Sequence, residues 1–187
     1  MKNLIIHPSD PSTSFLDIVY APLENKTVIT GGVTKSELME LIKEHDRVLM
    51  MGHGSPSGLF AVGQFKKETD SRWDLAYIID QSIVPLLKEK DNSVFIWCNA
   101  DRFVKYHGLQ GFYSGMFISE VGEATYCGIP GTDQDLIDES NFGFCNIIAK
   151  HIAEEKTLIH ENVKREYSLI AESNPVAFYN NMRLYVD

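Results

Sequence analysis

The 187-residue chain has few cysteines and no long apolar run, and both shortages exclude classes of protein. Its three cysteines, at positions 98, 127 and 145, form no CxxC pair, so the sequence predicts neither a disulfide framework nor a zinc ribbon. No stretch approaches the roughly 20 apolar residues that span a bilayer. The N-terminal MKNLIIHPSD lacks the apolar core of a signal peptide. We therefore expect a cytoplasmic protein without a membrane partner.

Basic side chains are also scarce. There are 17 Lys and Arg against 26 Asp and Glu, which gives a formal net charge of −9 at pH 7. Binding to a phosphate backbone depends on clustered Lys and Arg, so the composition argues against a nucleic-acid partner. Hydrophobic residues make up 44% of the chain and charged residues 23%, which is the balance of a globular domain. At this length we expect one domain over residues 1–187.

Short β-rich runs alternate with helical patterns, an order typical of a parallel sheet covered by helices. Short apolar or β-branched runs predict strands at residues 3–7, 26–30, 46–52 and 93–98. Later segments are predicted as a strand or hairpin at 116–126 and an edge strand at the C-terminus. The fold class is therefore α/β, a three-layer α/β/α sandwich with a mainly parallel sheet. We place its core at about 26–126 and a helical part at about 132–187.

Helices are predicted where apolar residues recur at helical spacing. Thr34 and Glu37 form a capping-box pattern that begins a helix ending near residue 44. After a polar insert at 64–72, apolar residues from 75 to 87 predict a second helix. A short helical turn is expected at 14–20, and the last helix near 162–172.

A reactive side chain follows each of two predicted buried strands. His53 comes directly after VLMMG, and Cys98 ends SVFIWC 45 positions later, which leaves room for one loop and one crossover helix. The carboxyl ends of parallel strands share one sheet edge, where ligands bind in open α/β sheets. If the two strands are neighbours, the two side chains meet there.

A cysteine beside a histidine suits acyl transfer. The thiolate is the attacking species, and a nearby imidazole can lower the thiol pKa and later protonate the leaving amine. Gly54 can bring its backbone N–H close to a substrate carbonyl, because no side chain stands in the way. Together with the N–H of Cys98 it would form an oxyanion hole. This chemistry needs no cofactor.

The segments GHGSPSG and FIWCNAD, each at the end of an apolar strand, resemble the caspase-like cysteine peptidases of clan CD. This group includes caspases, metacaspases, clostripain, gingipains, legumain and separases. The resemblance covers the core and implies peptide-bond hydrolysis through a thioester, with Cys98 as nucleophile, His53 as general acid/base and Gly54 as oxyanion donor. NADRF after the cysteine lacks the caspase glycine, and Ile96-Trp97 replaces the caspase glutamine. A clostripain-, gingipain- or metacaspase-type domain is therefore favoured, acting on a peptide or protein substrate, and a homodimer is allowed for.

Four polar residues are candidates for a substrate pocket: Ser55, Asp101, Glu120 and Glu123. Asp101 lies three positions after the expected nucleophile and could instead cap the next helix. Glu120 and Glu123 fall in the expected 116–126 strand. Relatives that cleave after Arg or Lys carry an acidic residue near this place, so the resemblance implies a basic substrate side chain. Solvent-facing acids on an alternating strand are an equal alternative.

The remaining candidates are assigned structural roles. Cys127 and Cys145 lack a neighbouring reactive motif and are predicted to pack in the core. Trp97 alternates with Cys98 along the strand, so it is expected to pack beneath the sheet. The other histidines form no HExxH pattern or matching ligand set, and no metal site is predicted.

Two alternatives to an enzyme stay open. The first is a catalytically inactive caspase-like module that binds a protein or peptide partner. The second is a different α/β fold, such as a flavodoxin-like binding domain, in which the His-Gly loop meets an anion.

Overall fold

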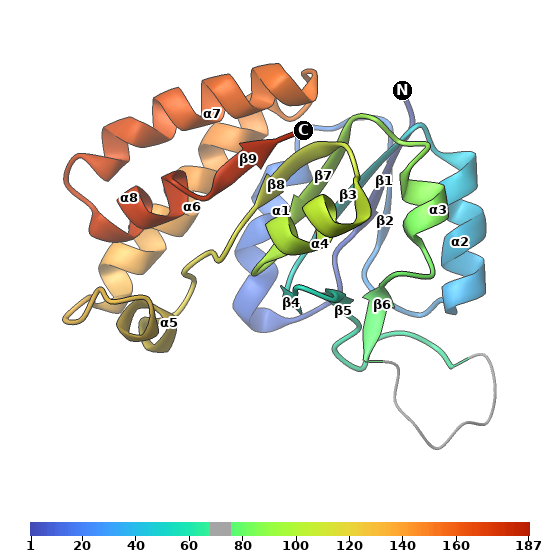
Figure 1. Cartoon of the computed structure of the whole chain (residues 1–187), viewed down its shortest axis with the longest axis horizontal. Helices are drawn as coiled ribbons and strands as arrows, with labels where there is room; N and C mark the ends of the chain where they lie inside the picture. The colour runs from blue at the N-terminus through green and yellow to red at the C-terminus, as the bar shows by residue number, and fades with distance from the viewer. Residues whose placement is uncertain (68–75) are drawn as a thin grey trace.

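The fold is that of a computed structural model, which describes residues 1–67 and 76–187. A six-stranded sheet lies between two layers of helices, so the α/β/α prediction is confirmed (Figure 1). In spatial order the strands are β2 (Lys26–Ile29), β1 (Asn3–Ile6), β3 (Arg47–Met51), β7 (Ser93–Ile96), β8 (Gly111–Ser114) and β9 (Leu184–Val186). All neighbouring pairs are parallel except β8 and β9, which are antiparallel.

The central strands are buried on both faces, as their continuous apolar runs predict. Successive side chains of a strand point to opposite faces, so each strand contributes to two separate cores. In β3, for example, Val48 and Met50 belong to one core and Leu49 and Met51 to the other. The sheet is thus held between two apolar layers.

Different helices cover the two faces. The first core is covered by α2 (Lys35–Glu44), α3 (Val84–Leu87) and α4 (Ala100–His107). The second is covered by η1 (Pro11–Leu16), α1 (Asp17–Tyr20), α6 (Gln134–His151), α7 (Lys156–Ala171) and α8 (Pro175–Asn181). In Figure 1, α4 lies in front of the sheet and α1 behind it. The capping box that begins α2 is confirmed, with Glu37 N–H donating to Thr34 Oγ1 at 3.1 Å.

The predicted helix over residues 75–87 is wrong in its first half. Residue 75 and the insert from 68 to 72 lie outside the described residues, but β6 (Tyr77–Ile79) is a strand. It pairs with β5 (Gly58–Phe60), and β5 pairs with β4 (Gly54–Ser55), so the HGSPSG segment forms a hairpin. The Asp80 carboxylate accepts from the Ser82 N–H at 2.9 Å, and this turn ends β6 before α3 begins.

The predicted strand or hairpin at 116–126 is also wrong. The strand lies earlier, at β8, and α5 (Val121–Tyr126) is a helix. A side chain at Gly111 would collide with the backbone of β7, so glycine is what lets β8 begin beside it. The helix is held by a small third core of Ile118, Ala124, Ile137 and Val176. The helical turn at 14–20 and the C-terminal edge strand are confirmed, the strand as β9. The helix near 162–172 is confirmed as part of α7, but it is not the last helix, because α8 follows it.

No helix in the described ranges has the combination of length and apolar composition that crossing a membrane requires.

Candidate active site

His53 and Cys98 follow two adjacent parallel strands. β3 pairs with β7 in a register that puts Met51 opposite Ile96, and each reactive residue is the second one after its strand. The predicted adjacency of the two strands is therefore confirmed. Both residues line one small cavity at this sheet edge, with a volume of about 30 Å³. A cavity of this size is well below the several hundred Å³ of usual ligand sites.

A serine and an aspartate that the sequence analysis missed hold His53. Ser12 Oγ lies 2.6 Å from His53 Nε2 and donates to Asp10 Oδ1, also at 2.6 Å. A hydroxyl has one proton, so a Ser12 that donates to Asp10 accepts from a protonated Nε2. Asp10 also accepts from the Ser12 N–H as the cap of η1. Among the described residues His53 Nδ1 has no hydrogen-bond partner, which leaves it as the nitrogen available to a substrate.

The Cys98 thiol is held away from ionisation. Its Sγ donates toward the Phe117 carbonyl at 3.4 Å and lies 3.8 Å from Glu123 Oε1. Burial, and next the nearby Glu123 carboxylate, raise the pKa of the Cys98 thiol to about 12. No hydrogen bond joins Cys98 to His53. The expected lowering of the thiol pKa by the imidazole is therefore wrong for this conformation.

Gly54 is required for packing. A Cβ at this position would lie 2.6 Å from Cγ of Trp97, whose indole covers the glycine. Trp97 is buried, as predicted, and its Nε1 donates to the Ser55 carbonyl at 3.1 Å. Ser55 Oγ lies 3.0 Å from Tyr77 Oη. Ser55 does not line the small cavity, and it does not line the second, larger cavity described below. The Cys98 backbone N–H has no acceptor within the described part of the chain, as an oxyanion donor requires.

The two glutamates lie in a helix and not in the expected strand. Glu120 is an exposed residue at the start of α5, and Glu123 lies within that helix, so their assignment to a strand is wrong. Glu123 Oε2 accepts from the Ser119 N–H at 2.7 Å and from Ser119 Oγ at 3.0 Å. These bonds hold the carboxylate beside Cys98.

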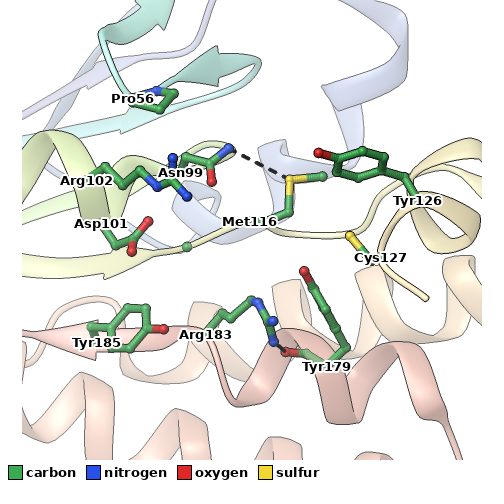
Figure 2. Close-up of a pocket in the computed structure, with 11 residues that line it drawn as sticks. Pro56, Asn99, Asp101, Arg102, Met116, Tyr126, Cys127, Tyr179, Arg183 and Tyr185 are labelled. Carbon is green, nitrogen blue, oxygen red and sulfur yellow. Dashed lines mark hydrogen bonds between the residues drawn. The ribbon is translucent and has the colours of Figure 1, made fainter. Parts of the chain in front are cut away.

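A second cavity of about 780 Å³ adjoins the chain turn that follows Cys98, because Asn99 lines it (Figure 2). Asn99 makes this turn in the left-handed conformation, with φ of 65°, and is the N-cap of α4. Asp101 therefore does not cap the helix, and it lines the cavity from the first turn of α4. Sequence reasoning missed two arginines of this cavity, Arg102 and Arg183, which are far apart in the chain.

The other two cysteines have different surroundings. Cys145 is fully buried in the core, which confirms its predicted packing role. Cys127 is half-buried and lines the larger cavity.

Comparison of the chain with models of known protein families, with curated proteins and with solved structures finds no match.

Proposed function

We propose that this chain is a caspase-like cysteine peptidase that cleaves peptide bonds through a thioester on Cys98, with His53 as the proton carrier. One observation carries the proposal: the two side chains follow adjacent parallel strands and line the same cavity at the carboxyl edge of the sheet. A nucleophile and a base carried by rigid strand ends suit covalent catalysis once the thiol turns toward the imidazole.

The reaction follows from these two groups. His53 takes the proton from Cys98 Sγ, and the thiolate attacks the substrate carbonyl carbon to form a C–S bond. The oxyanion accepts a hydrogen bond from the Cys98 backbone N–H. The Gly54 backbone N–H is the second candidate donor. When the C–N bond breaks, His53 gives its proton to the leaving amine. Water, deprotonated by His53, then hydrolyses the thioester and restores the thiol.

The described conformation corresponds to a resting state in this proposal. The thiol is hydrogen-bonded to the Phe117 carbonyl and lies near the Glu123 carboxylate, and the cavity that it shares with His53 has a volume of only about 30 Å³. Attack requires the thiol to turn from these partners toward His53. Catalytic hydrogen bonds are often long before substrate binds, so an open dyad in the free protein is compatible with turnover.

The test is labelling by a set of thiol-directed peptide electrophiles, read by mass spectrometry of the native protein. Cys98 is expected to react faster than Cys127 and Cys145, and His53→Gln is expected to slow it by about a hundredfold, the lower end for general acid–base catalysis. His107→Gln is the matched control, since His107-Gly108 is a second His-Gly pair outside the shared cavity. Equal labelling of the three cysteines, or no effect of His53→Gln, would rule the dyad out.

A non-catalytic module that binds a peptide or protein partner is the second candidate. The raised pKa of Cys98 and the small volume of its cavity favour it. In that case peptides bind with the same affinity to wild type and Cys98→Ala, and no product forms.

A further inference from the structure

A third pocket, outside the candidate active site, is formed by the β4–β5 turn, the end of β6 and the end of α4. Its volume of about 340 Å³ is within the range of small-ligand sites. Neither His53 nor Cys98 is among its lining residues in the described part of the chain. We call it the tyrosine pocket, and the lining residues used below are Ser57, Tyr77, Asp80, Gln81, Tyr106 and His107.

Three ring side chains line the tyrosine pocket, and packing fixes two of them. Tyr77 lies in β6 beside Phe60, with the ring centroids 5.1 Å apart. The His107 ring packs edge-on against Phe103 at 4.7 Å, and Phe103 is fully buried in the first core. Tyr106 meets the His107 ring edge-on at 4.9 Å, yet 85% of this tyrosine is exposed. The Tyr106 ring therefore has most of its surface available to pack against a ligand.

The polar groups of this pocket are neutral and lack partners. Within residues 1–67 and 76–187, no hydrogen bond uses the Ser57 hydroxyl, the Gln81 side-chain amide or the Tyr106 hydroxyl. The ring nitrogens of His107 are unpaired over the same ranges. Burial, and next the charge of Lys88, lower the pKa of His107, so its ring is neutral at pH 7 and carries one N–H. All four side chains can therefore donate a hydrogen bond to a ligand.

Asp80 does not make the pocket acidic. Its Oδ2 forms an ion pair with Lys35, and its Oδ1 accepts from the Ser82 N–H at 2.9 Å and from the Ser82 hydroxyl at 2.6 Å. It is the one acidic side chain among the lining residues that the structure describes. The pocket thus offers rings and hydrogen-bond donors, and its carboxylate oxygens already have partners. This combination suits a neutral ligand that carries acceptors and apolar rings.

A proline-rich peptide segment has this chemistry. In the polyproline II conformation the backbone makes no internal hydrogen bonds, so its carbonyls are free to accept, and proline has no N–H to donate. Such segments dock in aromatic-lined grooves because their conformation is already formed before binding. Pro56 lines both the tyrosine pocket and the larger cavity of Figure 2, so an extended segment that passes Pro56 finds further space.

We propose that the tyrosine pocket binds a proline-rich peptide segment in the polyproline II conformation, with proline rings against Tyr77 and Tyr106. The side chains of Ser57, Gln81 and His107 donate to its carbonyls. The site is separate from the candidate dyad and goes beyond the proposed peptidase function, because it recognises a segment by its conformation without cleaving it.

The test is calorimetric titration of the wild-type protein with a blocked decaproline peptide, which adopts polyproline II. Saturable one-to-one binding is expected, with a dissociation constant below about 1 mM. A blocked Gly-Ser peptide of the same length is expected not to bind, because it has no rings and is a flexible coil that would lose more entropy. Nuclear magnetic resonance of the backbone amides should show decaproline-induced shifts around Tyr77, Gln81 and Tyr106.

Tyr106→Ala is expected to weaken decaproline binding at least about tenfold, as for an aromatic residue at the centre of an interface. Tyr126→Ala is the matched control, because Tyr126 is 88% exposed and does not line the tyrosine pocket. Both tyrosines are largely exposed, so both variants should keep the melting temperature within about two degrees of wild type. Gln81→Ala removes one donor and should weaken binding about two- to tenfold.

Four results would overturn the inference: no binding of decaproline to wild type, equal binding of the Gly-Ser peptide, undiminished binding to Tyr106→Ala, or loss of binding in folded Cys98→Ala. Maltohexaose, a neutral oligosaccharide, is titrated in parallel. If it binds at the pocket and decaproline does not, the pocket is a sugar site and the inference is wrong. If decaproline binds as expected and no electrophile labels Cys98, the peptidase proposal fails and this inference stands.

Discussion

Replacing Glu123 by glutamine should make the Cys98 thiol more reactive. The carboxylate lies 3.8 Å from Sγ and is held there by two hydrogen bonds from Ser119. Glutamine has the same shape and keeps a carbonyl oxygen that can accept these bonds, but it carries no charge. In the variant, the negative charge of Glu123 would therefore no longer oppose the formation of the Cys98 thiolate.

The size of the effect follows from the pKa of the thiol. Burial, and next Glu123, raise the pKa of Cys98 from 9.0 to about 12, which corresponds to about 4 kcal/mol. Burial is the larger cause and persists in the variant, so the carboxylate accounts for less than about 2 kcal/mol. The thiolate fraction at neutral pH should therefore rise by at most about 30-fold. Intrinsic nucleophilicity falls as the pKa falls, so the reaction rate should rise by at most about six- to eightfold.

The assay is the rate at which iodoacetamide alkylates Cys98 in native protein, measured by peptide mass spectrometry between pH 7 and 9. Glu120→Gln is the charge-matched control, since Glu120 is exposed and its side chain makes no capping hydrogen bond. Ser119→Ala loosens the same segment and retains the charge. If Glu123→Gln leaves the rate unchanged, or Ser119→Ala raises it equally, the electrostatic explanation is refuted.

Three further predictions concern other residues. Ser12→Ala removes the hydroxyl at His53 Nε2 and should slow active-site labelling about two- to tenfold and shift its pH profile, with no loss of melting temperature. Gly54→Ala should cost about 1–3 kcal/mol in chemical denaturation, because the added Cβ meets the Trp97 ring; no loss would contradict that packing. Burial opposes protonation of His151, but hydrogen bonds to two glutamates raise its pKa. Its stabilisation is full below the ordinary value of 6.5 and is lost as pH rises through the raised value, so His151→Gln should lower the melting temperature more at pH 6 than at pH 9.

Local patterns were enough to place the strands that carry the candidate dyad. The runs before His53 and Cys98 are short, continuously apolar and bounded by polar or glycine residues, and such runs identify buried parallel strands. The capping box at Thr34 could be predicted from the sequence because its hydrogen bonds join residues three positions apart. Where apolar spacing suits both states, as at Ile78 and Ile79, the pattern predicted a helix and strand pairing with β5 prevailed.

The surroundings of the dyad depend on contacts between distant segments, and no local pattern contains them. Ser12 reaches His53 because η1 packs over the edge of the sheet, and Arg183 faces Arg102 because β9 returns antiparallel beside β8. The Asp-Pro-Ser sequence predicts a capped helix start, but it carries no information about which strand end lies beside it. The state of Cys98 has the same origin. The sequence identifies a thiol at a strand end, and the packing of residues 117–123 against that thiol makes it a weak acid, because burial and a nearby carboxylate both disfavour the thiolate.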